Sequence, residues 1–153
     1  LIGKIRPEWV QQHLPKEKIN SNIKLIYQPA MSQQELFEYL NEHLFDLNVQ
    51  PSRFDSFAMV VPETMMQGIP NLVSPFVGAG EMLKNGIDGF VMEKLNAACL
   101  ANGIIYYVSL SEVQKQELEL AVLKSAQEMT WENYNLVVKD VFQQILQEIK
   151  YHS

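Results

Sequence analysis

Two short segments of the chain carry residue types that could bind a phosphate or a sugar. In the first, residues 54–61, Asp55 stands just before a helix predicted to begin near Met59. The opening amides of a helix lack intrahelical acceptors and lie at the positive end of its dipole, so they suit a diphosphate or an array of sugar hydroxyls. In the second segment, residues 78–81, two glycines let the backbone approach a ligand closely, and Glu81 falls in the first turn of a short helix. Either segment alone is a weak signal.

The elements that must position these segments alternate between strand-length apolar runs and amphipathic helical stretches. This pattern is typical of a parallel sheet with helices on both faces, so we expect an α/β, Rossmann-like fold. Residues 1–3 resemble the end of a strand, and the predicted strands are 23–27, 46–50, 71–74 and 90–92. The predicted helices are 7–14, 33–43, 59–68, a short one from 81, 111–128 and 131–149. In such a sheet, ligands bind beyond the carboxyl ends of the strands, where both segments fall.

Local signals set several of these boundaries. Ser32 and Glu35 have capping-box spacing at the start of the helix 33–43. Pro62 is compatible only with the first turn of its helix, because an interior proline would break it. The pair Asp88-Gly89 predicts a tight turn before the last strand.

Length, composition and charge restrict the class of protein. The 153 residues fit one domain, residues 1–153, with a single core. A net charge of −6 disfavours nucleic acid as a partner, because such binding depends on Lys and Arg neutralising phosphates. The single cysteine, Cys99, forms no internal disulfide, which favours a cytoplasmic location. No apolar stretch approaches the roughly 20 residues of a transmembrane span, and even the run 103–110 is short.

A set of landmarks with a specific spacing connects the two segments. In chain order they are Pro51-Ser52, Asp55, Glu63 after seven further residues, Gly68-Ile69-Pro70, the loop from Gly78 to Glu81, and the turn from Gly86 to Gly89. This order and spacing resembles the donor-domain signature of family 4 glycosyltransferases, which have the two-domain GT-B fold. Ser32 to Leu36 and Trp131 resemble flanking features of the same family. The resemblance implies that the chain is the C-terminal, nucleotide-sugar-binding half of a larger enzyme, lacking the first strand of that half.

The same resemblance assigns roles to residues. Asp55 takes the position of the acid that contacts hydroxyls of the transferred sugar, and Glu63 that of the acid that holds the ribose; these are the two residues expected to serve catalysis. A carboxylate can accept hydrogen bonds from two neighbouring hydroxyls, which suits both roles. Further donor contacts are implied for the backbone of Phe57, Ala58 and Met59 (sugar), the amides near Met59 and Val60 (phosphate), Ala30 and Met31 (base), and the glycine loop of Gly78 and Gly80.

The implied reaction is a retaining, metal-independent hexosyl transfer from a nucleoside-diphosphate sugar, with a uridine derivative as the expected donor and no cofactor. A glycan or lipid-linked acceptor would contact the other half of the enzyme, which places the protein in the cytoplasm or at the inner face of the membrane. The arginine and lysine that clamp the diphosphate in the family precede the residues present here. We therefore expect the isolated chain to be inactive.

Two alternatives to a transferase remain open from the sequence. Asp55 stands where the family usually has glutamate, which is compatible with a non-catalytic domain of the same fold that binds a sugar nucleotide or a partner protein. A sugar-nucleotide epimerase of the same two-domain architecture is the other alternative. Metal and hydrolase sites are not supported, because His13, His43 and His152 lack metal-ligand spacing and a paired nucleophile.

Overall fold

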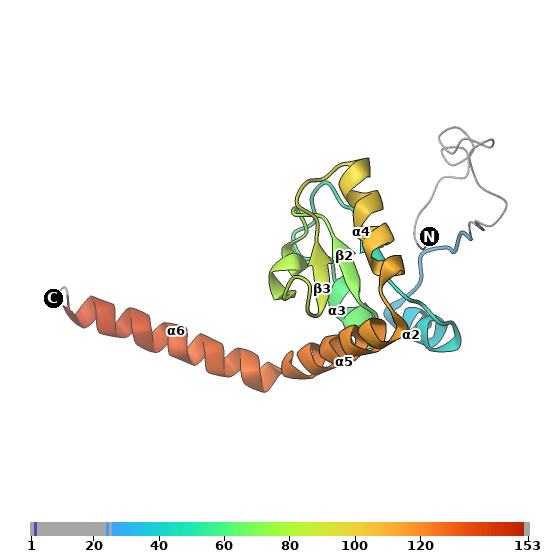
Figure 1. Ribbon diagram of the computed structural model, residues 1–153. Helices are drawn as coiled ribbons and strands as arrows, with labels where there is room; N and C mark the ends of the chain where they lie inside the picture. Colours follow the sequence, from blue (N-terminus) through green and yellow to red (C-terminus); the bar gives the residue numbers. More distant parts are fainter. Residues whose placement is uncertain (1, 3–23, 25, 152–153) are drawn as a thin grey trace. The chain divides into compact units, whose positions relative to one another are not determined.

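The computed structural model describes residues 2, 24 and 26–151 (Figure 1). The chain divides into two compact units, Leu1–His43 and Leu44–Ser153, and each is described here by itself. Among the described residues, no helix is long and apolar enough to cross a membrane. The helix expected over residues 7–14 lies outside the described residues.

In the first unit, the helix α2 spans Gln33–Glu42 and begins as the sequence predicts. The hydroxyl oxygen of Ser32 accepts from the Glu35 backbone N–H, and the Ser32 N–H donates to Glu35 Oε2 at 2.7 Å, which completes a capping box. That backbone hydrogen bond, and a second one from the Ser32 side chain, lower the pKa of Glu35 below its ordinary value of 4.5. The strand expected over 23–27 is not seen at Lys24, Ile26 or Tyr27; a single parallel bridge joins Ile2 to Gln28 instead.

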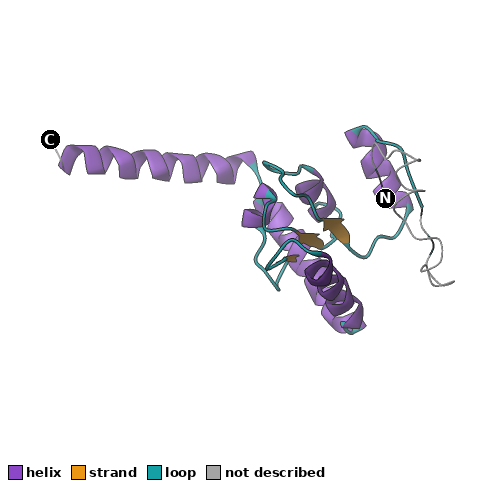
Figure 2. Cartoon of the chain, turned by 90° about the horizontal axis from the view of Figure 1, so that it is seen from above, coloured by secondary structure: helices purple, strands orange, loops and turns teal. Residues whose placement is uncertain are grey.

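The second unit contains a three-stranded parallel sheet with the order β1-β2-β3. The strands β1, β2 and β3 span Asn48–Gln50, Asn71–Val73 and Gly89–Val91. In register, Asn48 pairs with Asn71 and Asn71 with Gly89. Figure 2 shows these short strands among longer helices and loops. The parallel sheet confirms the predicted α/β class. The strands β1 and β2 are shorter than expected, and β3 has the expected length but begins one residue earlier.

The helix α3, Val60–Met65, follows β1 and is joined to the sheet by a buried polar network. Its third residue is Pro62, which therefore lies in the first turn as predicted. The fully buried side chain of Asn71 accepts from Asn48 Nδ2 at 2.6 Å and from Thr64 Oγ1 at 2.9 Å, and it donates to main-chain carbonyls. Gly68, at φ +75, ends the helical segment in a left-handed conformation that favours glycine.

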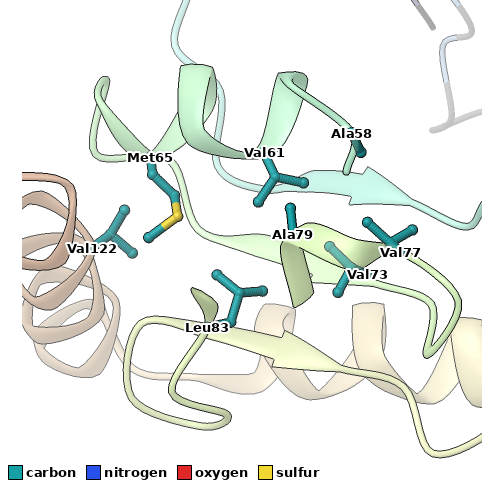
Figure 3. Packing of buried hydrophobic residues seen from close by; sticks show 8 residues of the cluster. All are labelled: Ala58, Val61, Met65, Val73, Val77, Ala79, Leu83 and Val122. Atoms are coloured by element: carbon teal, nitrogen blue, oxygen red, sulfur yellow. The ribbon is translucent and has the colours of Figure 1, made fainter. Parts of the chain in front are cut away.

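Residues on opposite faces of β2 contact different helices. Val73 belongs to a buried cluster with Val61 and Met65 of α3. Figure 3 shows Val61 pointing from α3 toward Ala79, whereas Met65 points toward Val122, which comes from α5 (Glu112–Glu128). Leu72, the neighbour of Val73, faces α4, Ala97–Ser109, where Gly103 leaves room for its side chain. Because successive strand residues point to opposite faces, helices cover both faces of the sheet, as predicted.

The sequence patterns predict no helix or strand over the residues of α4. Its N-cap, Asn96, accepts a 2.8 Å hydrogen bond from the Cys99 N–H. A β-branched and aromatic run after Gly103 lowers helix propensity, yet packing against Leu72 stabilises the helix. A Cβ at Gly103 would lie 2.8 Å from Leu72 Cδ2, so this glycine permits close approach of α4 to the sheet.

Two further elements complete the chain. The 3-10 helix η1, Gly78–Met82, begins earlier than the short helix expected from Glu81. The helix α6, Trp131–Tyr151, occupies the region predicted to be helical, and the described side chains of its apolar stripe, such as Phe142 and Leu146, are exposed.

Candidate functional site

The loops that follow β1 and β2 are tied together by backbone hydrogen bonds. The Asp55 N–H donates to the Phe76 carbonyl at 3.0 Å, and the Gly78 N–H donates to the Asp55 carbonyl at 2.9 Å. The Ala79 N–H donates to the Phe57 carbonyl at 2.8 Å. The two segments that the sequence singled out therefore form one structure at the carboxyl ends of neighbouring parallel strands.

The Asp55 side chain shapes the turn that leads into α3. Its Oδ1 accepts from the Phe57 N–H at 3.1 Å, a local bond typical of aspartate in turns. Ala58 follows at φ +64, a left-handed conformation that costs a non-glycine residue about 1–2 kcal/mol. The surrounding packing holds this conformation, because Ala58 belongs to the buried cluster. Backbone strain of this kind is concentrated at ligand-binding loops in proteins.

The first amides of α3 have no protein partner in the part of the chain that the structure describes. Met59 is the N-cap and provides no side-chain cap. Intrahelical bonding starts with the Val61 N–H, which donates to the Ala58 carbonyl at 2.9 Å. Among the described residues, the N–H groups of Met59 and Val60 have no acceptor.

Gly78 is required by the approach of the two loops to each other. A Cβ at this position would overlap the carbonyl oxygen of Ser56. At Gly80 a Cβ would lie 3.2 Å from Val73 Cγ2, so this glycine brings η1 close to the sheet. The sequence predicts that both glycines let the backbone approach a ligand closely. In the structure, the atoms nearest to a Cβ added at either glycine belong to the protein itself.

A pocket of about 590 Å³ opens where the loops meet. It is lined by Phe54, Asp55, Ser56, Pro75, Phe76, Val77, Gly78, Gly80, Glu81 and Val91. Every lining residue lies at or beyond the carboxyl end of a strand, which is the position where open α/β sheets bind ligands. The volume falls within the range of small-molecule sites, and the combination of apolar walls with a few polar groups is typical of them.

The structure brings some of the predicted site residues into this pocket and not others. Asp55, Gly78 and Gly80 line it. Glu63 is half-buried on α3 outside the lining. The remaining predicted residues of this unit, none of which lines the pocket, are Phe57, Ala58, Met59 and Val60. Ala30 and Met31 belong to the other unit, where they precede α2.

Several lining residues were not predicted as site residues, namely Phe54, Ser56, Pro75, Phe76, Val77, Glu81 and Val91. The sequence contained a partial signal for them, since Phe54 and Ser56 flank Asp55 and Glu81 follows Gly80. The contribution of Phe76 depends on the folding of the β2 loop over the β1 loop, which no local pattern specifies.

One buried acid lies outside the pocket lining. Asp88, which the sequence places in a turn, is fully buried and accepts from the Lys84 N–H at 2.7 Å and from Ser125 Oγ at 2.6 Å. The hydrogen bond from Ser125 connects the turn before β3 to α5, and the one from Lys84 stabilises the turn itself. We therefore assign Asp88 a structural role. Among the described residues, no group of three or more His, Cys, Asp or Glu side chains is arranged to hold a metal ion.

An open parallel sheet covered by helices on both faces, with a pocket at the carboxyl ends of its strands, defines the class of Rossmann-like α/β domains. Residues 3–128 match the family described as glycosyl transferases group 1, and the chain belongs to this family. The family recognised from the sequence landmarks is thereby confirmed.

Individual relatives agree with this assignment. The chain is 25% identical over 150 residues to the sucrose synthase of Nitrosomonas europaea, an alignment that covers 86% of this chain and 19% of that protein. It superposes on the sucrose-phosphate synthase of Thermosynechococcus elongatus with a TM-score of 0.66 and 20% identity, covering 92% of this chain and 33% of the other. Anabaena HepE, solved in complex with UDP and glucose, superposes with a TM-score of 0.57 and 19% identity, covering 80% and 33%. The fold is that of GT-B glycosyltransferases, and the chain spans about a fifth to a third of these proteins.

Proposed function

We propose that this chain is the donor-binding domain of a retaining glycosyltransferase that takes a hexose from a uridine-diphosphate sugar. The observation that carries the proposal is the pocket at the carboxyl ends of β1, β2 and β3, which contains Asp55 from the family's signature. Membership of the glycosyl transferases group 1 family supports a nucleotide-sugar donor. The complex of HepE with UDP and glucose makes uridine the first nucleoside to test.

We assign each part of the donor molecule to the residues whose chemistry suits it. Asp55 accepts hydrogen bonds from hydroxyls of the transferred sugar, with the backbone of Phe57 and Ala58 alongside. The N–H groups of Met59 and Val60, which lack acceptors among the described residues, donate to phosphate oxygens. Glu63 holds the ribose hydroxyls.

In the proposed mechanism, the N–H groups of Met59 and Val60 bind the diphosphate most strongly in the transition state. Negative charge develops on the leaving diphosphate as the glycosidic bond breaks, so donors already in position stabilise the transition state more than the ground state. We propose that the transfer requires no metal ion. The acceptor, a glycan or a lipid-linked sugar, contacts a part of the enzyme outside this chain, at the cytoplasmic side of the membrane.

A donor-binding domain without transfer activity is the second candidate. The feature that favours it is Asp55, whose side chain is one methylene shorter than the glutamate usual at this position. Both candidates require binding of a sugar nucleotide; only the first requires turnover when the complete enzyme is assayed.

The test of donor binding is a titration of the ¹⁵N-labelled chain with UDP and with UDP-glucose, followed by amide chemical shifts. Gly78 and Gly80 serve as probes of the pocket, and amides of α6 serve as a reference outside it. We expect UDP-glucose to move the glycine resonances, with the same titration curve in the presence of a chelator. Absence of binding by both nucleotides at millimolar concentration, or shifts confined to α6, would exclude the proposed donor site.

A further inference from the structure

The pocket combines two carboxylates with an apolar wall. Its side-chain polar groups are those of Asp55, Ser56 and Glu81, and no Lys, Arg or His is among the residues that line it. Asp55 is half-buried beside the β2 loop, whereas Glu81 is exposed in the first turn of η1. The side chains that line the pocket therefore contribute two negative charges and no positive charge to it.

The apolar wall contains two phenyl rings that the protein leaves largely uncovered. Phe54 and Phe76 are 81% and 53% exposed, and they come from the loops after β1 and β2. A pyranose ring presents hydroxyls at its edge and C–H groups on its faces. Carboxylates can accept from the hydroxyls, and an aromatic face can cover the C–H groups, so this lining suits a neutral sugar.

An anionic group is disfavoured in the same place. A carboxylate on a ligand in this pocket would share the pocket with Asp55 and Glu81, and it would lose part of its hydration without meeting a cation on the pocket lining. Like-charge juxtaposition of this kind is a recurrent source of discrimination between similar ligands. Here it acts against a uronic acid, which differs from the corresponding hexose by a carboxylate at C6.

We infer that this pocket takes the neutral hexose of the donor and rejects a uronic acid, with Asp55 and Glu81 as the specificity-determining residues. The inference rests on the proposed donor site and adds the charge class of the sugar. Asp55 already has a proposed role toward the sugar hydroxyls; the charge-selective role of Glu81 is an addition to it.

The experiment compares UDP, UDP-glucose and UDP-glucuronic acid as ligands of the complete 153-residue chain by calorimetry or NMR titration. We expect UDP-glucuronic acid to bind at least about tenfold more weakly than UDP-glucose, which corresponds to about 1.4 kcal/mol. Because the discrimination is electrostatic, raising the salt concentration should reduce this ratio.

Variants that remove one negative charge each identify the residues that discriminate against UDP-glucuronic acid. Glu81→Gln and Asp55→Asn keep side-chain size while removing one negative charge each, so each should bring the affinity for UDP-glucuronic acid closer to that for UDP-glucose by several fold. Asp140→Asn, on α6, changes the net charge of the chain equally and should leave the ratio as it is. This control separates the effect of the charges in the pocket on ligand affinity from the effect of the net charge of the chain.

The outcomes distinguish this inference from the proposed function. Binding of UDP-glucose together with equal binding of UDP-glucuronic acid would overturn the inference and leave the donor site in place. The inference would also be overturned if both charge-removing variants kept the wild-type ratio of the affinities for UDP-glucose and UDP-glucuronic acid. It would equally be overturned if Asp140→Asn changed this ratio as much as they do. Failure of UDP and UDP-glucose alike to bind would remove the donor site itself, and the inference with it.

Discussion

At the scale of single residues, the donor proposal depends on a difference between two acids. Asp55 lines the pocket and also accepts from the Phe57 N–H, whereas Glu63 is half-buried on α3 outside the lining. Their positions are consistent with contacts to different parts of one donor. The proposed sugar contact of Asp55 and the ribose contact of Glu63 therefore lead to different expectations for UDP and for its sugar conjugate.

We predict that Glu63→Ala weakens binding of UDP and UDP-glucose alike, and that Asp55→Ala weakens UDP-glucose while leaving UDP nearly unchanged. Loss of a charged hydrogen-bond partner costs about 1.5–3 kcal/mol, or roughly a tenfold to hundredfold loss of affinity. Calorimetric titration of both variants with both ligands gives the four values, with Asp140→Ala as the control. Equal losses in all four combinations would mean that the acids act through folding, for example through the turn at Asp55.

A second residue-scale prediction concerns Gly78, because its role is steric. In Gly78→Ala the new Cβ would overlap the Ser56 carbonyl oxygen, so the two loops must separate. We expect a loss of about 1–3 kcal/mol in the free energy of unfolding, measured by urea denaturation, together with weaker UDP-glucose binding. Gly86→Ala is the matched control, since Gly86 has φ +81 but no atom within 4 Å of the added Cβ.

Gly86→Ala should cost about 1–2 kcal/mol through backbone strain alone and leave the affinity for UDP-glucose unchanged. A Gly78→Ala variant as stable as the wild-type chain would contradict the close loop contact on which the pocket depends.

At the scale of elements, α2 begins with the capping box of Ser32 and Glu35. The Ser32 N–H and hydroxyl both lower the pKa of Glu35, so ionised Glu35 stabilises this helix end. Since the pKa is lowered in the folded state, the contribution is present above the pKa of the unfolded chain. It is lost as the pH falls through the lower, folded value.

We predict that Ser32→Ala raises the pKa of Glu35 part of the way back to its ordinary value. The rise is partial because the larger effect comes from the backbone N–H, which alanine retains. An NMR titration of the Glu35 side-chain carbons gives this pKa directly, and α2 amide exchange should become faster in the variant. Ser32→Thr, which keeps a hydroxyl, should preserve the lowered pKa; an unchanged value in Ser32→Ala would contradict the role of the serine side chain.

At the scale of the whole molecule, the chain spans about a fifth of a curated sucrose synthase and a third of a solved sucrose-phosphate synthase. Glycosyl transfer requires a donor and an acceptor to be held in reacting geometry, and this positioning supplies a large part of the rate enhancement. In our proposal, the described pocket holds the donor and a part of the enzyme outside this chain holds the acceptor.

We therefore predict that the purified 153-residue chain binds a sugar nucleotide but does not transfer its sugar. The measurement is the release of UDP and the incorporation of labelled hexose into candidate glycan or lipid-linked acceptors, with an active glycosyltransferase as the positive control. Repeated turnover by the chain alone would show that it contains the acceptor site as well.

Local patterns were sufficient for several elements of the fold. The Ser32 capping box and Pro62 in the first turn of α3 depend on backbone geometry within a few residues of each signal, and both agree with the structure. The end of α3 was predicted at residue 68, whereas the helix ends at Met65. The alternation of strands and helices indicated a parallel sheet. The helix α4 was missed because its β-branched run and Gly103 oppose helix formation locally, while contact with Leu72 favours it.

The sequence by itself determined the family, the α/β class and the two loops to consider, because landmark spacing and hydrophobic period are properties of the linear chain. Only the tertiary structure decided which side chains share the pocket. Phe76 and Glu81 reach it because the β2 loop is hydrogen-bonded to the β1 loop through Asp55 and Phe57, and Glu63 lies outside the lining because it belongs to the next helix. Such long-range pairing depends on parallel strands placing their carboxyl ends at the same edge of the sheet, which no single segment encodes.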